Sequence, residues 1–119
     1  MFSRPSRIFA SVLVCALGPA TPSSGAMGQC DFETMKSDAV ATVNACSAVL
    51  ADKTLGPEQR GQALKMRGRA LRFQSHVDYA IKDFDEALKL MPNDPELLEH
   101  RGLAAFDQKN YAYAAELAN

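Results

Sequence analysis

A pattern that recurs at a constant offset constrains this 119-residue chain more than any other feature of its sequence. Five residues of one segment, Leu64, Arg67, Gly68, Tyr79 and Ala80, return in the same order as Leu98, Arg101, Gly102, Tyr113 and Ala114. The offset is roughly 34 residues, a length typical of a unit of two helices that cannot bury its apolar face alone and therefore stacks on its neighbour. The sequence therefore predicts a helical array.

The segment 1–26 has the layout of a secretory signal peptide, and we expect it to be removed. Arg4 and Arg7 precede an uncharged apolar run over 8–17, and Ser24-Gly25-Ala26 provides small residues before a predicted cleavage after Ala26. The run is shorter than the roughly 20 apolar residues that cross a bilayer, so we expect no stable membrane span after cleavage. The alternatives are an uncleaved anchor and an unstructured tail.

Removal of the signal leaves two cysteines, Cys30 and Cys46, in a mature chain over 27–119. An even pair in an exported protein indicates a disulfide, and the alternative is two free thiols. Closing a loop of about 15 residues stabilises a fold by roughly 3 kcal/mol in the chain-entropy model. The contribution matters because small domains bury a smaller share of their surface.

Charge and motifs argue against several classes of function. The mature part carries 11 basic and 14 acidic residues, a net charge of −3, which lacks the basic footprint of a nucleic-acid-binding protein. His76 and His100 have no second ligand three or four residues later, so we expect surface histidines and no metal site. The chain has no nucleophile elbow and no glycine-rich phosphate loop. We therefore expect neither an enzyme nor a cofactor.

Apolar residues at helical spacing predict an all-α chain. Proline and glycine mark the expected boundaries, at 55–57 and 92–95. A short lead-in over 28–34 comes first, and a cap at Ser37-Asp38 begins the first expected helix, over 39–51. The next expected helices run over 57–73, 78–91 and 96–107. A last helix is expected from Tyr111, after a turn at Lys109-Asn110. The expected inward residues of the two central helices are Ala63, Leu64, Gly68, Leu71, Ala80, Ile81, Phe84, Ala87 and Leu88.

Several recurring or clustered residues have expected structural roles. Glycine costs about 1 kcal/mol relative to alanine inside a helix, so the recurrence of Gly68 as Gly102 predicts the close approach of a neighbouring helix. The recurring arginines, Arg67 and Arg101, are expected to pack between helices. The recurring tyrosines, Tyr79 and Tyr113, are expected in the core or at turns. The acidic run Asp83, Asp85 and Glu86 is expected on a solvated helix face.

The stretch 79–95 resembles a tetratricopeptide repeat. It carries the small, aromatic, small and proline positions of that family as Ala80, Phe84, Ala87 and Pro92, and the preceding helix carries Leu64, Gly68 and Leu71. The resemblance covers about residues 61–119 and implies antiparallel helix pairs stacked as a short α-solenoid. It implies a capping segment over 27–60, one repeat over 61–94 and a second, truncated repeat over 95–119. It also implies an adaptor or scaffold for protein–protein binding.

A cysteine pair placed before the first good repeat resembles exported tetratricopeptide proteins of Gram-negative bacteria. This resemblance implies a periplasmic protein whose N-terminal cap is held by a disulfide. Two alternatives remain open. In the first, the chain is the N-terminal non-catalytic module, or a fragment, of a longer cell-envelope protein or enzyme. In the second, it is a structural unit that self-associates into a homo-oligomer through its truncated C-terminal helix.

The family resemblance places partner binding on a concave face built from the first helix of each repeat. The implied candidates are Gln62, Lys65, Met66, Arg69, Arg72, Phe73, Glu96, Glu99, His100, Leu103 and Phe106. Lys65, Arg69 and Arg72 share one helical stripe, and we expect them to receive a carboxylate or an acidic segment of a protein or peptide partner. The adjacent Phe73 would hold an apolar side chain. The alternative is a basic face that is partly paired with neighbouring acids.

Overall fold

The computed structural model describes residues 28–118, and this part of the chain contains five helices and no strand. The helices are α3 (Phe32–Ser37), α4 (Ala39–Leu50), α5 (Pro57–Phe73), α6 (Val77–Leu90) and α7 (Pro95–Ala118). The predicted all-α class is confirmed. No helix within 28–118 has the length and hydropathy needed to cross a membrane. The expected signal peptide and its cleavage site lie outside the described residues.

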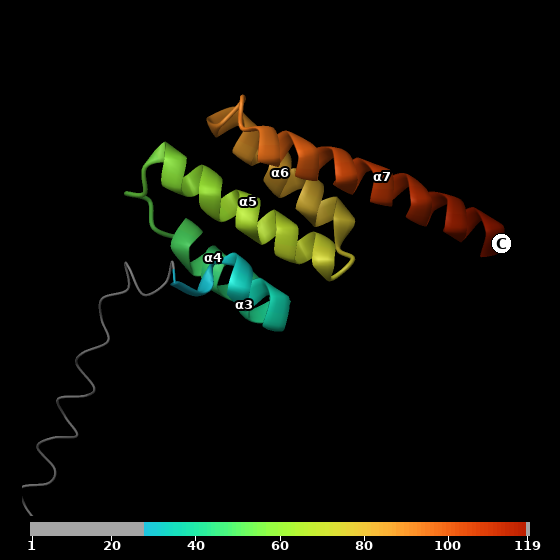
Figure 1. Cartoon of the computed structure of the whole chain (residues 1–119), viewed down its shortest axis with the longest axis horizontal. Coiled ribbons are helices and arrows are strands. Elements are labelled where there is room, and N and C mark those ends of the chain that lie inside the picture. Colours follow the sequence, from blue (N-terminus) through green and yellow to red (C-terminus); the bar gives the residue numbers. More distant parts are fainter. Residues whose placement is uncertain (1–27, 119) are drawn as a thin grey trace, which may run out of the picture.

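The helices follow one another as a row of neighbours, each packed against the next one along the chain (Figure 1). The short α3 packs on α4, and α4 packs on one side of α5 while α6 packs on the other. Helix α7 lies along α6 and also touches α5. The C-terminal half of α7 projects beyond the other helices (Figure 1).

Side-chain caps explain where several helices begin. The carboxylate of Asp31 accepts a hydrogen bond from the Thr34 amide at 2.7 Å, and that of Asp38 accepts from the Ala41 amide at 3.0 Å. Pro57 occupies the first turn of α5, as expected. The α3 helix was not predicted, because its six residues are too few to show an apolar period.

Two apolar clusters form the core, and α5 contributes to both. The larger lies among α5, α6 and α7 and consists of Leu64, Val77, Ala80, Phe84, Ala87, Leu97 and Ala104. The smaller joins the N-terminal segment to α5 and consists of Cys30, Cys46, Val49 and Ala63. Because Ala63 and Leu64 are consecutive, their side chains point to different sides of α5 and link the two clusters.

The predicted disulfide between Cys30 and Cys46 is present. The two sulfurs lie 2.08 Å apart, the Cα atoms 4.8 Å apart, and both residues are buried. The bond ties the segment just before the short α3 to the middle of α4. It therefore holds the N-terminal segment against the rest of the bundle.

The expected turn at Lys109-Asn110 is wrong, because α7 continues through it to Ala118. The corresponding turn of the first repeat includes Ser75 with φ of 69°, and the chain there reverses so that α6 packs its apolar face on α5. Phe84 is the largest fully buried side chain in the described chain, and its counterpart at the repeat offset is Ala118. A reversal in the second repeat would bury little, and the alanine-rich stretch after Tyr111 has high helix propensity.

Asp83 of the acidic run differs from expectation, whereas Asp85 and Glu86 are exposed as expected. Asp83 is only 5% exposed, and its carboxylate accepts two hydrogen bonds from Arg67, at 2.7 and 2.9 Å. Arg67 also donates to the Ser47 hydroxyl at 3.1 Å, so the pair links α4, α5 and α6. Tyr79 and Tyr113 are 62% and 63% exposed, so neither is a core residue.

The recurring glycines have different surroundings, which predicts opposite effects of the same substitution. A Cβ at Gly68 would lie 2.6 Å from the buried Phe84 ring, whereas one at Gly102 would meet nothing within 4 Å. We expect Gly68→Ala to lower the free energy of unfolding by about 1–3 kcal/mol through overpacking. We expect Gly102→Ala to raise it by up to about 1 kcal/mol through helix propensity. Urea unfolding of both variants tests this, and a stabilised Gly68→Ala protein would contradict it.

Candidate functional site

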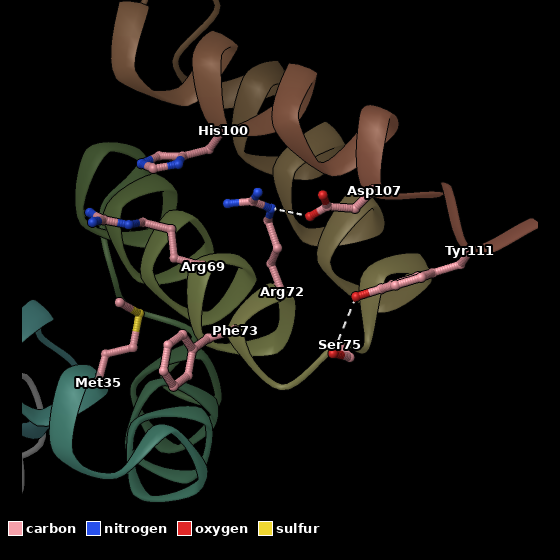
Figure 2. A pocket seen from close by; sticks show the side chains of 8 residues that line it. All are labelled: Met35, Arg69, Arg72, Phe73, Ser75, His100, Asp107 and Tyr111. Atoms are coloured by element: carbon pink, nitrogen blue, oxygen red, sulfur yellow. Dashed lines mark hydrogen bonds and ion pairs between the residues drawn. The ribbon is translucent and has the colours of Figure 1, made fainter. Parts of the chain in front are cut away.

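A groove of about 370 Å³ lies among α3, α5 and α7 and is the best candidate for a binding site in the described part of the chain. Figure 2 shows its lining, in which cationic, aromatic and hydroxyl side chains converge from three helices and the turn after α5. The lining residues are Met35, Arg69, Arg72, Phe73, Ser75, His100, Asp107 and Tyr111.

Helical periodicity places these side chains on facing surfaces. Arg69, Arg72 and Phe73 lie three and four residues apart on α5, and His100, Asp107 and Tyr111 are spaced by seven and four on α7. The Met35 side chain reaches the groove from α3, which begins two residues after the disulfide-bonded Cys30. The groove therefore depends on the N-terminal segment as well as on the repeated region.

The two arginines of the groove make few contacts with other parts of the described chain. Arg72 donates from Nε to Asp107 at 2.5 Å, and Arg69 donates to Glu96 at 3.4 Å while stacking over the Phe32 ring at 4.7 Å. A guanidinium has five N–H donors in a planar fork, so each arginine keeps donors that these bonds do not use. Figure 2 shows the end of Arg72 directed into the space between His100 and Asp107.

His100 is half-buried and not a surface residue as predicted, whereas His76 is exposed as predicted. The His100 ring stacks on Phe84 at a centroid distance of 6.1 Å. Its Nδ1 atom is buried and has no hydrogen-bond partner among residues 28–118. Burial, together with the positive charges of Arg69 and Arg72, lowers the pKa of His100 below its ordinary value, against the opposing effect of nearby carboxylates.

This lowered pKa predicts that the free energy of unfolding decreases as pH falls from neutral. Well above pH 6.5, the ordinary value, the imidazole is neutral in the folded and unfolded states, and stability is at its full value. As pH falls below 6.5, the unfolded chain takes up the proton first, so stability decreases down to the lower folded pKa. We expect His100→Phe, which keeps a ring on Phe84, to reduce this decrease. Urea unfolding across this range tests it, and an unchanged pH dependence would count against it.

Lys65, the third member of the predicted basic stripe, lies apart from the groove. Its side chain is 7% exposed, and Nζ donates to Asp94 at 3.1 Å and to Glu96 at 2.8 Å. Burial favours a lower pKa for Lys65, but the hydrogen bonds to Glu96 and Asp94 outweigh burial and raise it. Lys65 lowers the pKa of Glu96, and it also lowers the pKa of Asp94 against the opposing effect of burial. Lys65 therefore joins α5 to the start of α7.

The other predicted concave residues divide between the groove and its surroundings. Arg69, Arg72, Phe73 and His100 line the groove, whereas Met66 packs against the smaller core cluster. Gln62 is exposed elsewhere on α5, and Glu99, Leu103 and Phe106 are exposed on α7, but none of the four lines the groove. Sequence reasoning missed Met35, Ser75, Asp107 and Tyr111. For Asp107 and Tyr111 the sequence did hold a signal, because they follow His100 by seven and eleven residues and such spacings place side chains on one face of a helix.

Residues 28–118 contain no group of three or more His, Cys, Asp or Glu side chains arranged to hold a metal ion. Comparison with protein-family models, with curated proteins and with solved structures finds no match to this chain. Proposals about its function therefore depend on the repeat, the groove and the disulfide.

Proposed function

We propose that this protein is an exported interaction module of the tetratricopeptide type, which binds a segment of a partner protein in the groove among α3, α5 and α7. The observation that carries the proposal is the convergence of Arg69 and Arg72 with the largely exposed ring of Phe73 in one groove. This combination suits a peptide that presents a carboxylate next to an apolar or aromatic side chain.

The repeat assignment has support from packing as well as from the sequence. Gly68 of α5 accommodates the Phe84 ring of α6, which gives the recurring glycine the role expected between the two helices of one repeat. Helix α5, the short turn and α6 make the first repeat in this proposal, and the N-terminal half of α7 begins the second. The Cys30–Cys46 disulfide suits an oxidising compartment such as the periplasm.

The charges of the groove define the ligand more closely. Arg69 and Arg72 border the groove, whereas Lys65 is occupied by Asp94 and Glu96, so the two arginines receive the acidic group in this proposal. Asp107, already paired with Arg72, would repel a second carboxylate at that end of the groove. The ligand carboxylate is therefore expected nearer Arg69 and the free end of Arg72 than Asp107.

Binding of synthetic peptides tests this function. The probes are short peptides with an aromatic residue beside a free C-terminal carboxylate, and the same peptides amidated at that end. We expect the carboxylate forms to bind more tightly, and Arg69→Gln/Arg72→Gln to weaken this binding about tenfold or more, because hydrogen bonds to charged groups are worth about 1.5–3 kcal/mol each. We expect Phe73→Ser to weaken the binding of both forms.

The matched control removes two positive charges elsewhere. Lys82 and Lys89 are exposed on α6, which contributes no residue to the groove, so Lys82→Gln/Lys89→Gln changes the net charge equally. Equal binding by the arginine variant and the wild type, or no preference for the carboxylate peptides, would overturn the proposal. Circular dichroism checks that every variant remains helical.

A further inference from the structure

An apolar stripe runs along α7 on the side that faces away from its own core. Leu103, Phe106, Tyr113 and Leu117 are between 40% and 70% exposed, and Asn110 lies between the two halves. The spacings alternate between three and four residues, which is the period of a seam between two packed helices. Leu97 and Ala104, the buried residues of α7, lie on the opposite side of the helix. In the described chain nothing covers the stripe.

We propose that two copies of this chain associate through this stripe, with their α7 helices side by side and antiparallel. The stripe is self-complementary in this orientation. Phe106 of each copy lies opposite Leu117 of the other, and Tyr113 lies opposite Asn110, whose amide pairs with the phenol hydroxyl. A single asparagine in such a seam sets the register of the two helices.

The charges beside the stripe favour the antiparallel orientation. Lys109 and Glu116 flank it on one side, both are exposed, and neither forms an ion pair within residues 28–118. The antiparallel arrangement brings Lys109 of one copy next to Glu116 of the other, twice by symmetry. In the parallel arrangement, Lys109 meets Ala114 instead, and neither charge gains a partner.

The position and size of the stripe agree with an interface between two copies. The C-terminal half of α7 projects beyond the bundle, so a second helix reaches it without contacting the other helices of the first copy (Figure 1). Aromatic side chains bury about 150–250 Å² each when fully covered. Two half-covered aromatics and Leu117 bury a few hundred Å² per copy, below the roughly 800 Å² of a standard interface. We therefore expect a reversible dimer that depends on concentration.

Sedimentation of the purified protein, with its disulfide oxidised, tests this interface. We expect the wild-type chain to pass from monomer to dimer as its concentration rises, and Phe106→Glu to remain monomeric at every concentration. Tyr79→Glu is the matched control, because Tyr79 and Phe106 are each 62% exposed and Tyr79 lies on α6. We expect this control to dimerise like the wild type. A wild-type chain that is monomeric throughout would overturn the proposal.

A charge exchange tests the orientation. Lys109→Glu and Glu116→Lys each place like charges together twice, so we expect either one to raise the dimer dissociation constant about tenfold, a change that corresponds to about 1.4 kcal/mol. The double variant Lys109→Glu/Glu116→Lys restores both pairs, and we expect it to dimerise like the wild type. Failure of the double variant to recover would overturn the antiparallel arrangement. None of these residues lines the groove, so peptide binding is expected to be unchanged.

Discussion

Asp83→Ala is expected to lower the free energy of unfolding by about 3 kcal/mol or more, because removing one partner of a buried ion pair leaves the other charge uncompensated. The Asp83 side chain is 7% exposed, and both of its oxygens accept hydrogen bonds from Arg67. The Arg67 side chain is 26% exposed, so water partly compensates its charge, and the loss of stability should lie near the lower end of the range for buried pairs. Urea unfolding of the oxidised protein measures the change.

The chain offers a matched control for this substitution. Asp85 also pairs with an arginine of a neighbouring helix, Arg101 of α7, at 2.6 Å, but its side chain is 50% exposed. We expect Asp85→Ala to cost less than about 1 kcal/mol, because water competes for both charges. We expect Arg67→Met/Asp83→Leu to recover most of the lost stability, since an apolar pair often replaces a buried ion pair without loss. Equal costs for Asp83→Ala and Asp85→Ala would contradict a buried role for Asp83.

Loss of the disulfide is expected to lower the free energy of unfolding by roughly 3 kcal/mol, the chain-entropy value for a loop of this length. The two cysteines are 16 residues apart, and the loop between them contains α3. We propose Cys30→Ala/Cys46→Ala as the variant, because alanine avoids placing a new hydroxyl at the fully buried Cys46. Urea unfolding compares it with the oxidised and reduced wild-type protein.

Three results together would identify the missing disulfide as the cause of the lower stability. The reduced wild-type protein should be about as unstable as the double alanine variant, and a reductant should not change the variant further. Because α3 carries Met35 into the groove, both forms should also bind the carboxylate peptides more weakly than the oxidised protein. Equal stability of the oxidised and reduced wild-type protein would contradict the prediction.

Most of the helical framework was predictable from the sequence because its signals are local. Proline at the first turn and the apolar period predicted both ends of α5 to within a residue. The cap at Asp38 predicted the first residue of α4. Apolar spacing also identified the inward face of α6, with Ala80, Phe84 and Ala87 fully buried. The disulfide followed from an even number of cysteines after the predicted signal.

The site was predictable only in part, because its members come from separate helices. The helical stripe indicated Arg69 and Arg72, the family resemblance indicated the adjacent Phe73, and all three line the groove. Lys65 lies on the same stripe but pairs with Asp94 and Glu96, which lie at the start of α7. Spacing along one helix describes a direction in space, but it does not show which acids a second helix brings there.

The sequence by itself determined α4, α5 and α6, the cysteine pair and the repeat, since propensity, capping and periodicity act over short stretches of chain. Only the tertiary structure decided what each repeated residue contacts. Gly68 faces the Phe84 ring and Gly102 faces open space, although an arginine directly precedes each of these glycines. Asp83 is buried and Asp85 is exposed, although they lie two residues apart on one helix. Burial depends on which helix packs opposite, and α7 continues straight where α5 is followed by a turn and a packed partner.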